Sequence, residues 1–278
     1  LAAGVPANKI VVHGNNKSMA ELQHAIEAGV SRIVIDSFDE IDRIVQIAAK
    51  RTVDVDVLVR LTLGVEAHTH EFIATAHEDQ KFGLSVVSGA AERAVLALIN
   101  AKHVNLRGFH SHIGSQIFDT RGFEVATKRA LDFVAHMRSA HKFVTQELDL
   151  GGGMGIAYLP EDDPLSAEDI ARALRDIIVK DCEKLGIDIP KLSIEPGRAI
   201  IGPSMVTVYE VGTVKPVELD GGATRLYVSV DGGMSDNIRT ALYDAQYTAR
   251  LANREPLGTP VPARIVGKHC ERGDIVVK

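Results

Sequence analysis

Six short apolar segments that are typical of buried β-strands alternate with stretches of helical periodicity over most of the chain. They are residues 10–13, 32–36, 57–61, 107–110, 147–150 and 191–195. Strands that alternate with helices usually lie in one parallel sheet, because each helix carries the chain back to the start of the next strand. The sequence therefore predicts an α/β fold. In a parallel barrel, the carboxyl ends of these strands would share one face.

Capping residues mark the ends of the predicted helices. Ser18 and Glu21 have the spacing of a capping box, and Gly29 stands where the helix should end. Ser166 and Gly186 bound another helix in the same way. A further helix is indicated by apolar residues at helical spacing: Phe123, Ala126, Ala130, Val134 and Met137.

The pattern changes after Pro203. Two β-rich runs follow, at residues 205–214 and 225–230, without a full helical segment between them. This change predicts one domain over residues 1–202 and the start of a second, β-rich domain over residues 203–278. A complete barrel has eight units and typically about 250 residues, so the first domain is expected to be incomplete.

Three of the strand-like segments end in residues suited to holding a phosphorylated ring. One is followed by His112-Ile-Gly-Ser115, the next by Gly151-Gly152-Gly153, and the last by Glu195-Pro-Gly-Arg198. Consecutive glycines allow close approach of the backbone, and amide groups beside a helix N-terminus favour a phosphate. The Glu195 carboxylate can keep a basic ring nitrogen protonated, because a nearby negative charge favours the protonated form. Together these residues predict a phosphorylated cofactor with a ring nitrogen.

Composition narrows the class of protein. The chain has 278 residues, 45% hydrophobic and 24% charged, which is typical of a globular protein with a large core. It has neither an apolar run long enough to cross a membrane nor a signal segment at its start, so a cytoplasmic protein is expected. Two cysteines are too few for a disulfide framework. A net charge of -6 argues against nucleic-acid binding.

In order and spacing, the motifs resemble those of the fold-type III pyridoxal-phosphate-dependent decarboxylases, and within them the diaminopimelate decarboxylases. The matching segments are HGNNKS (13–18), GFHSHIGSQ (108–116), LDLGGG (148–153), EPGR (195–198), VDGGMSDNIR (230–239), ALY (241–243) and CE (270–271). The resemblance implies a (β/α)8 TIM barrel of the alanine racemase-like type, without its first units, followed by the start of a β-domain. It also implies pyridoxal 5'-phosphate as cofactor and the decarboxylation of meso-2,6-diaminopimelate to L-lysine and carbon dioxide, the last step of lysine biosynthesis.

The resemblance assigns cofactor-binding roles to residues at the strand ends. His112 would stack on the cofactor ring, Ser115 would reach its phosphate, and Glu195 would hold its ring nitrogen. The remaining phosphate contacts are implied for Gly152, Gly153, Gly197 and Arg198. Because neighbouring residues match as well, this interpretation of His112 outweighs that of an ordinary core histidine.

Substrate-binding and catalytic roles follow in the same way. Arg198 faces the substrate in this family, while Arg239 and Tyr243 could hold the distal carboxylate, since an arginine fork suits carboxylate geometry. Glu271 could hold the distal ammonium group, and Cys270 is the candidate proton donor. In the family this Cys-Glu pair comes from the partner subunit, which implies a homodimer with shared active sites.

Two features depart from the family pattern. Arg272 stands where the family usually has a serine, and this cation could repel the substrate ammonium or disturb the turn. No motif resembles the Tyr-x-x-Lys-Ala-like segment that carries the family's Schiff-base lysine, and Lys17 is interpreted as a loop lysine near a helix start. Because the chain begins at Leu1 rather than Met and ends at Lys278 inside a strand-like run, we interpret it as a fragment lacking both termini. Without the Schiff-base lysine, it is expected to be inactive alone.

Other interpretations remain open. The chain could be a related decarboxylase for another diamino acid, or a non-catalytic relative that binds the cofactor. A metal-dependent barrel hydrolase is a more remote alternative, since His-x-His pairs at strand ends can bind zinc. The histidines in question are His68, His70, His77, His110 and His112. No carboxylate-rich set follows at the later strand ends, so no metal site is predicted. Arg60, near the end of a strand, is left without a role.

Overall fold

The computed structural model describes residues 1–65 and 80–278, and these form two compact units. The first unit comprises Leu1–Gly155 and Pro164–Ala199, and the second comprises Ile156–Asp163 and Ile200–Lys278. The chain thus passes from the first unit to the second close to the boundary predicted after residue 202. A short segment before Pro164 also groups with the second unit.

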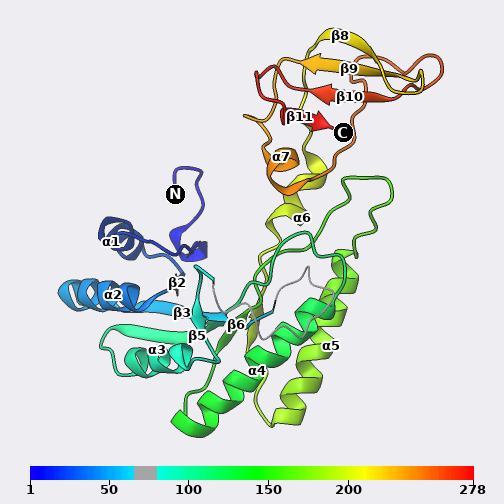
Figure 1. Ribbon diagram of the computed structural model, residues 1–278. Coiled ribbons are helices and arrows are strands. Elements are labelled where there is room, and N and C mark those ends of the chain that lie inside the picture. Colours follow the sequence, from blue (N-terminus) through cyan, green and yellow to red (C-terminus); the bar gives the residue numbers. More distant parts are fainter. Residues whose placement is uncertain (66–79) are drawn as a thin grey trace. The chain divides into compact units, whose positions relative to one another are not determined.

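A parallel sheet forms the centre of the first unit (Figure 1). Its strands are β1 (Val11–Val12), β2 (Arg32–Ile35), β3 (Val55–Thr62), β4 (Leu84–Ser85), β5 (Val104–His110), β6 (Glu147–Asp149) and β7 (Lys191–Ser193). The strand order is β1-β2-β3-β5-β6-β7, and β4 pairs with β3. Every pair of neighbouring strands in this sheet is parallel, which confirms the predicted α/β class.

Helices connect these strands and cover the sheet. They are α1 (Met19–Ala28), α2 (Phe38–Arg51), α3 (Ala90–Ile99), α4 (Arg121–His141) and α5 (Ala167–Leu185). In Figure 1, α1, α2 and α3 follow one another along one side of β2, β3 and β5, and α4 lies beside α5. Within the described parts of the chain, we find no helix both long and apolar enough to cross a membrane.

The predicted capping residues define the helix ends. The Ser18 hydroxyl accepts a hydrogen bond from the Glu21 amide, and the Glu21 carboxylate accepts one from the Ser18 amide, which completes the capping box. Gly29 ends α1 in the left-handed conformation, at a φ of 73°, where glycine avoids the steric cost of a side chain. At α5 the Ser166 hydroxyl accepts a hydrogen bond from the Asp169 amide, and Gly186 ends the helix in the left-handed conformation.

A charged network joins the starts of several strands in the first unit. Arg32, at the start of β2, contacts Glu147 in β6 at 3.0 Å and Asp56 in β3 at 3.1 Å. Arg107 also contacts Asp56, at 3.0 Å. Because Glu147 is buried, Arg32 compensates a carboxylate that would otherwise be costly inside the protein. The network lies at the amino ends of the strands, opposite the ends that carry the predicted site.

The second unit contains a four-stranded mixed sheet. Its strands are β8 (Val211–Glu218), β9 (Thr224–Val230), β10 (Ala263–Val266) and β11 (Ile275–Val277), in the order β11-β10-β9-β8. Strand β9 is antiparallel to β8 and parallel to β10. A short helix, α7 (Arg239–Tyr243), lies between β9 and β10 in the sequence, and α6 (Gly197–Ile201) and a 3-10 turn (Gly202–Ser204) lie between β7 and β8.

Some predicted boundaries are wrong. Residues 205–210 were expected to start a strand, but β8 begins only at Val211. This is the residue that pairs with Val230, the last residue of β9. The six residues before it have alternating apolar side chains but no strand opposite them, because strand formation requires a partner as well as propensity.

Candidate active site

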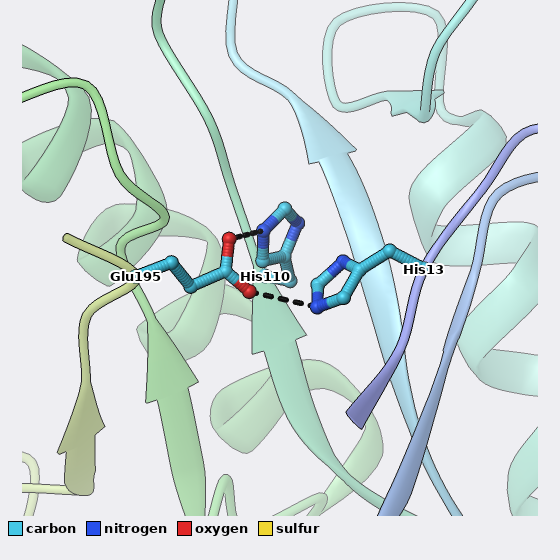
Figure 2. A group of neighbouring side chains, drawn as sticks. All are labelled: His13, His110 and Glu195. Atoms are coloured by element: carbon cyan, nitrogen blue, oxygen red, sulfur yellow. Dashed lines mark hydrogen bonds and ion pairs between the residues drawn. The ribbon is translucent and has the colours of Figure 1, made fainter. Parts of the chain in front are cut away.

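Two histidines and a glutamate meet at the carboxyl ends of the strands in the first unit (Figure 2). His13 follows β1, His110 is the last residue of β5, and Glu195 follows β7. The Nε2 atom of His13 lies 2.7 Å from Oε1 of Glu195, and Nε2 of His110 lies 3.4 Å from Oε2. Figure 2 shows the carboxylate between the two rings, with one oxygen directed at each. The strand ends therefore bring one carboxylate and two imidazoles together.

The surroundings of Glu195 keep it ionised. Burial opposes its ionisation, but hydrogen bonds from His110 and His13 outweigh burial and hold the pKa of its carboxyl well below the usual range. An ionised carboxylate only accepts hydrogen bonds, so both Nε2 atoms are donors. Its two oxygens have about four acceptor positions, so a third donor can still bind. Glu195 is thus a negative group with room for another N–H.

His110 is the most enclosed member of this cluster. It is 1% exposed, and its Nδ1 atom has no hydrogen-bond partner among the residues that the structure describes. With Nε2 donating to Glu195, a neutral His110 carries no proton on Nδ1. Its ring also packs edge-on against that of His13, at a centroid distance of 4.9 Å. Ring packing and the shared carboxylate fix both imidazoles.

His112 lies two residues after His110, beyond the end of β5, and its side chain does not bind Glu195. Its Nδ1 atom accepts a hydrogen bond from the Gly152 amide at 3.3 Å, so it holds the loop after β6 rather than Glu195. Burial and the positive charge of Arg60 lower the pKa of this imidazole. Arg60 itself packs over the Phe82 ring at 4.4 Å. His112 is therefore held neutral near pH 7, as suits stacking on a ring.

The Gly151–Gly153 run allows the strand ends to approach closely. Both Gly151 and Gly153 have positive φ angles, 70° and 111°. A Cβ atom on any of the three glycines would collide with a backbone oxygen of a neighbouring segment: that of Ser111, Glu195 or Gly114. Among the described residues, the Gly153 amide has no hydrogen-bond acceptor. This amide therefore remains available to a ligand.

Arg198 and Ser115 lie together at the edge of the same site. Nη2 of Arg198 donates to Oγ of Ser115 at 2.9 Å, and Nη1 donates to the Gln116 side chain at 3.2 Å. The Gly197 amide donates to the carbonyl oxygen of Glu195, which turns the chain into α6. The predicted phosphate-binding side chains of the first unit are thus neighbours.

Apart from Arg198, the predicted substrate residues and Cys270 belong to the second unit and are described within it. The Arg239 guanidinium lies 5.1 Å from the centre of the Tyr243 ring, both on α7 as predicted, and its buried Nε has no acceptor among the described residues. The Glu271 carboxylate accepts the Gly273 amide at 3.3 Å, and Cys270 is an exposed free thiol. Arg272 is exposed in this turn.

The sequence did not reveal the roles of three residues: His13 and His110, which hold Glu195, and Lys17, which pairs with Glu40. His13 and His110 were matched as parts of motifs but were given no role in holding Glu195. Lys17 was interpreted as a loop lysine. It does precede α1, but it is 4% exposed, and its Nζ lies 2.8 Å from Oε1 of Glu40, on α2. The sequence signal for His13 and Lys17 was the polar HGNNKS segment directly after an apolar strand, but nothing in this segment indicates Glu195 or Glu40 as their partners.

Residues 1–202 match the pyridoxal binding domain of the pyridoxal-dependent decarboxylases. The chain belongs to the pyridoxal-dependent decarboxylase family. In the solved structures of related decarboxylases, a TIM-barrel-like domain is joined to a β-domain. The two units of this chain correspond to these two domains, which confirms the predicted fold type.

Individual relatives agree with the family match. The chain is 56% identical to the diaminopimelate decarboxylase of Mycobacterium tuberculosis over 282 residues, covering 100% of this chain and 63% of that protein. Among solved structures, it is similar to diaminopimelate decarboxylase from M. jannaschii in complex with L-lysine, with a TM-score of 0.82, 30% identity and 62% of that chain covered. It is also similar to diaminopimelate decarboxylase from Helicobacter pylori in complex with L-lysine, with a TM-score of 0.83, 26% identity and 65% of that chain covered. The chain thus spans less than two thirds of the length of these relatives.

Pyridoxal phosphate is the cofactor of this family, and the residues present fit it. Glu195 is an ionised carboxylate with spare acceptor positions, which suits a protonated ring nitrogen. The Gly153 amide and the Arg198 guanidinium, beside the Ser115 hydroxyl, are the types of donor that hold phosphates. The donors and the carboxylate all belong to the first unit.

The cluster of His13, His110 and Glu195 also has the composition of a metal site, with ligand atoms within 4.8 Å of one another. It is not the His110-x-His112 pair that the hydrolase alternative required, because His112 binds Gly152 instead. His68, His70 and His77 lie outside the described residues. The family match decides in favour of the decarboxylase interpretation.

Proposed function

We propose that this chain is part of an enzyme that decarboxylates meso-2,6-diaminopimelate at its D-centre, giving L-lysine and carbon dioxide. The observation that carries the proposal is the Glu195 carboxylate, held ionised at the barrel's strand ends by two imidazoles. The 56% identity to a diaminopimelate decarboxylase supports this substrate. L-lysine in two related solved structures supports the product.

Glu195 holds the proton on the pyridine nitrogen. The ionised carboxylate raises the proton affinity of a basic nitrogen beside it, and His13 and His110 keep it from taking up that proton. Bound pyridoxal phosphate supplies an electron sink for the carbanion that remains when carbon dioxide leaves. His112, neutral because of burial and Arg60, stacks on the ring face without adding positive charge.

Residues after β5, β6 and β7 would hold the phosphate group of the cofactor. The Gly153 amide has no acceptor among the described residues, Gly152 precedes it in the turn after β6, and Gly197 lies in the turn after β7. Arg198 and Ser115 already form a hydrogen-bonded pair, so both are oriented toward one location. A fork of guanidinium donors binds phosphate and carboxylate oxygens with defined geometry, so Arg198 also faces the substrate.

The distal end of the substrate is recognised by the second unit. Arg239 has a buried Nε without an acceptor among the described residues, which a distal carboxylate would satisfy. Tyr243, stacked with Arg239, contributes its hydroxyl. Glu271 pairs with the distal ammonium group, and the Cys270 thiol delivers a proton to the carbanion. Both come from the partner subunit of a homodimer, as the family resemblance implies, and the composition of the chain supports a cytoplasmic enzyme.

The proposal is tested by substrate competition with the full-length protein that contains this chain. Purified protein loaded with pyridoxal phosphate is offered equal concentrations of meso-diaminopimelate, L-ornithine and L-lysine, and carbon dioxide release and amine products are measured. We expect L-lysine from diaminopimelate to dominate, because ornithine lacks the distal carboxylate. Faster turnover of ornithine would replace this proposal with a decarboxylase for another diamino acid, and no turnover would favour a non-catalytic relative.

A further inference from the structure

A second cluster of metal-binding side chains lies away from the candidate active site, where α3 meets the end of α4. Glu92 is in the first turn of α3, and His136 and His141 are in the last turns of α4. Nε2 of His141 lies 2.6 Å from Oε1 of Glu92, and Nε2 of His136 lies 3.3 Å from the same oxygen. The three ligand atoms are all within 4.8 Å of one another. None of these residues has a role in the proposed reaction.

We propose that Glu92, His136 and His141 form a binding site for a divalent transition metal of the zinc type. Imidazole nitrogens and a carboxylate oxygen are zinc's usual ligands, at bond lengths of about 2.0–2.2 Å. In tetrahedral geometry such bonds place neighbouring ligand atoms about 3.3 Å apart. The His136–Glu92 separation already matches this value, and the His141–Glu92 contact has to open by less than about 1 Å.

The electrostatic surroundings favour a cation. His136 and His141 are at the carboxyl end of α4, where the helix dipole is negative. Hydrogen bonds from His141 and His136 hold the pKa of the Glu92 carboxyl below its usual range, so it is available as an anion. The neighbouring cations point elsewhere: Arg93 donates to the Ser88 carbonyl, Arg138 to that of Gly186, and Lys142 to that of Ser139.

The geometry and exposure of the rings are compatible with a metal ion that also holds a water molecule. The two imidazoles are at 86° to one another with centroids 6.3 Å apart, so they approach the carboxylate from different directions. The His136 side chain is half-exposed, at 51%, which keeps one side of the site open to solvent. Three protein ligands and one water would complete four-coordination. The bound metal would tie α3 to α4.

The test uses the full-length protein with pyridoxal phosphate bound. Zinc binding is measured by isothermal titration calorimetry, and cobalt is used as a spectroscopic substitute whose visible absorption reports four-coordination. We expect wild-type protein to bind zinc through this site and to show a higher Tm with zinc present. His136→Asn and His141→Asn should each weaken binding by at least about 10-fold.

His103→Asn is the matched control. His103 also contacts a carboxylate, Asp54, at 3.0 Å, but among the described residues it belongs to no cluster of three metal-binding side chains, so its loss should leave zinc affinity unchanged. Because His136 is half-exposed, its replacement leaves the fold intact, which circular dichroism checks. The proposal is overturned if wild-type protein binds no zinc, or if the His136→Asn/His141→Asn protein binds zinc as tightly as wild type. In that case the cluster is only an ion pair between two helices.

Discussion

His13 and Glu195 follow the two outermost strands of one sheet, yet their side chains are in contact, with Nε2 and Oε1 2.7 Å apart. Strands β1 and β7 are separated by four others, and in a flat sheet they would be about 24 Å apart, at about 4.8 Å per neighbour. Two side chains of this size cannot span that distance. The sheet therefore curls until its edges face one another, and the contact across the opening is part of the candidate active site.

Replacing His13 with alanine should lower both the free energy of unfolding and the affinity for pyridoxal phosphate. The change removes a hydrogen bond to an ionised carboxylate, worth about 1.5–3 kcal/mol. Urea denaturation measures the first effect, and titration of the cofactor-free protein followed by absorbance measures the second. His24→Ala, an exposed histidine on α1, is the control. Equal behaviour of the two variants would show that the His13 contact has no energetic role.

The pKa of Glu195 should make stability depend on pH in a defined direction. Its folded-state pKa is depressed, so its contribution is complete above the unfolded value near 4.3 and is lost as pH falls through the folded value. Glu195→Gln removes this contribution. The difference in unfolding free energy between wild type and Glu195→Gln should stay constant from pH 7 to about 5 and shrink below that. A difference that grows on acidification contradicts the assignment.

Replacing Lys17 with methionine should cost about 3–5 kcal/mol, because the change leaves the buried Glu40 without its cation. The Nζ atom of Lys17 also donates to the carbonyl oxygens of Gly14 and Val34, so both lose a partner. Denaturant titration gives the stability. The double variant Lys17→Met/Glu40→Leu should recover a large part of the loss, since no unpaired charge remains. No recovery in the double variant would mean that packing, not charge, makes Lys17 important.

Gly153→Ala should destabilise the protein by about 2 kcal/mol or more and weaken cofactor binding. The residue has a φ of 111°, and a Cβ would meet the Gly114 carbonyl oxygen. Gly186→Ala is the matched control, because Gly186 has a φ of 63° but open space around it. Its cost should be limited to the backbone term, about 1 kcal/mol. Thermal denaturation and cofactor titration of both variants measure the comparison, and similar losses would argue against a tight contact at Gly153.

In the full-length enzyme, Arg239→Ala should raise KM for meso-diaminopimelate by about 10-fold or more, as expected for a charged hydrogen bond worth about 1.5–3 kcal/mol. Steady-state kinetics measures the change. Arg239→Lys keeps the positive charge and loses the planar fork, so it should fall between wild type and alanine. If KM is unchanged in the alanine variant, Arg239 does not contact the substrate.

Local patterns in the sequence were sufficient to predict the parallel strands, the capped helices and the glutamate after β7. Ser18, Gly29 and Glu195 each act through neighbours close in the chain or through a strand end that a short apolar run defines. The roles of His13 and Lys17 could not be predicted in this way. His13 reaches Glu195 only because the sheet curls, and Lys17 is buried only because α2 brings Glu40 to it. Both depend on pairings between distant segments that no local pattern contains.

The second unit shows the same limit. Residues 205–210 have strand-like alternation, but Val211 is the first residue with a partner across the sheet. In the proposed homodimer, Arg239 and Glu271 at one substrate would come from different subunits, a pairing that no local pattern in the sequence contains. The turn around Glu271, in contrast, is local: the Gly273 amide donates to the Glu271 carboxylate two residues earlier, with Arg272 between them.

The charged network around Arg32 connects strands at the rim opposite Glu195. Strand register is therefore anchored at the rim opposite the candidate active site, and the Glu195 rim does not have to supply that anchoring. Protein engineers can use this division: loops at the Glu195 rim can be diversified to seek new ligands, while Arg32, Asp56 and Glu147 are kept constant as the foundation of the scaffold.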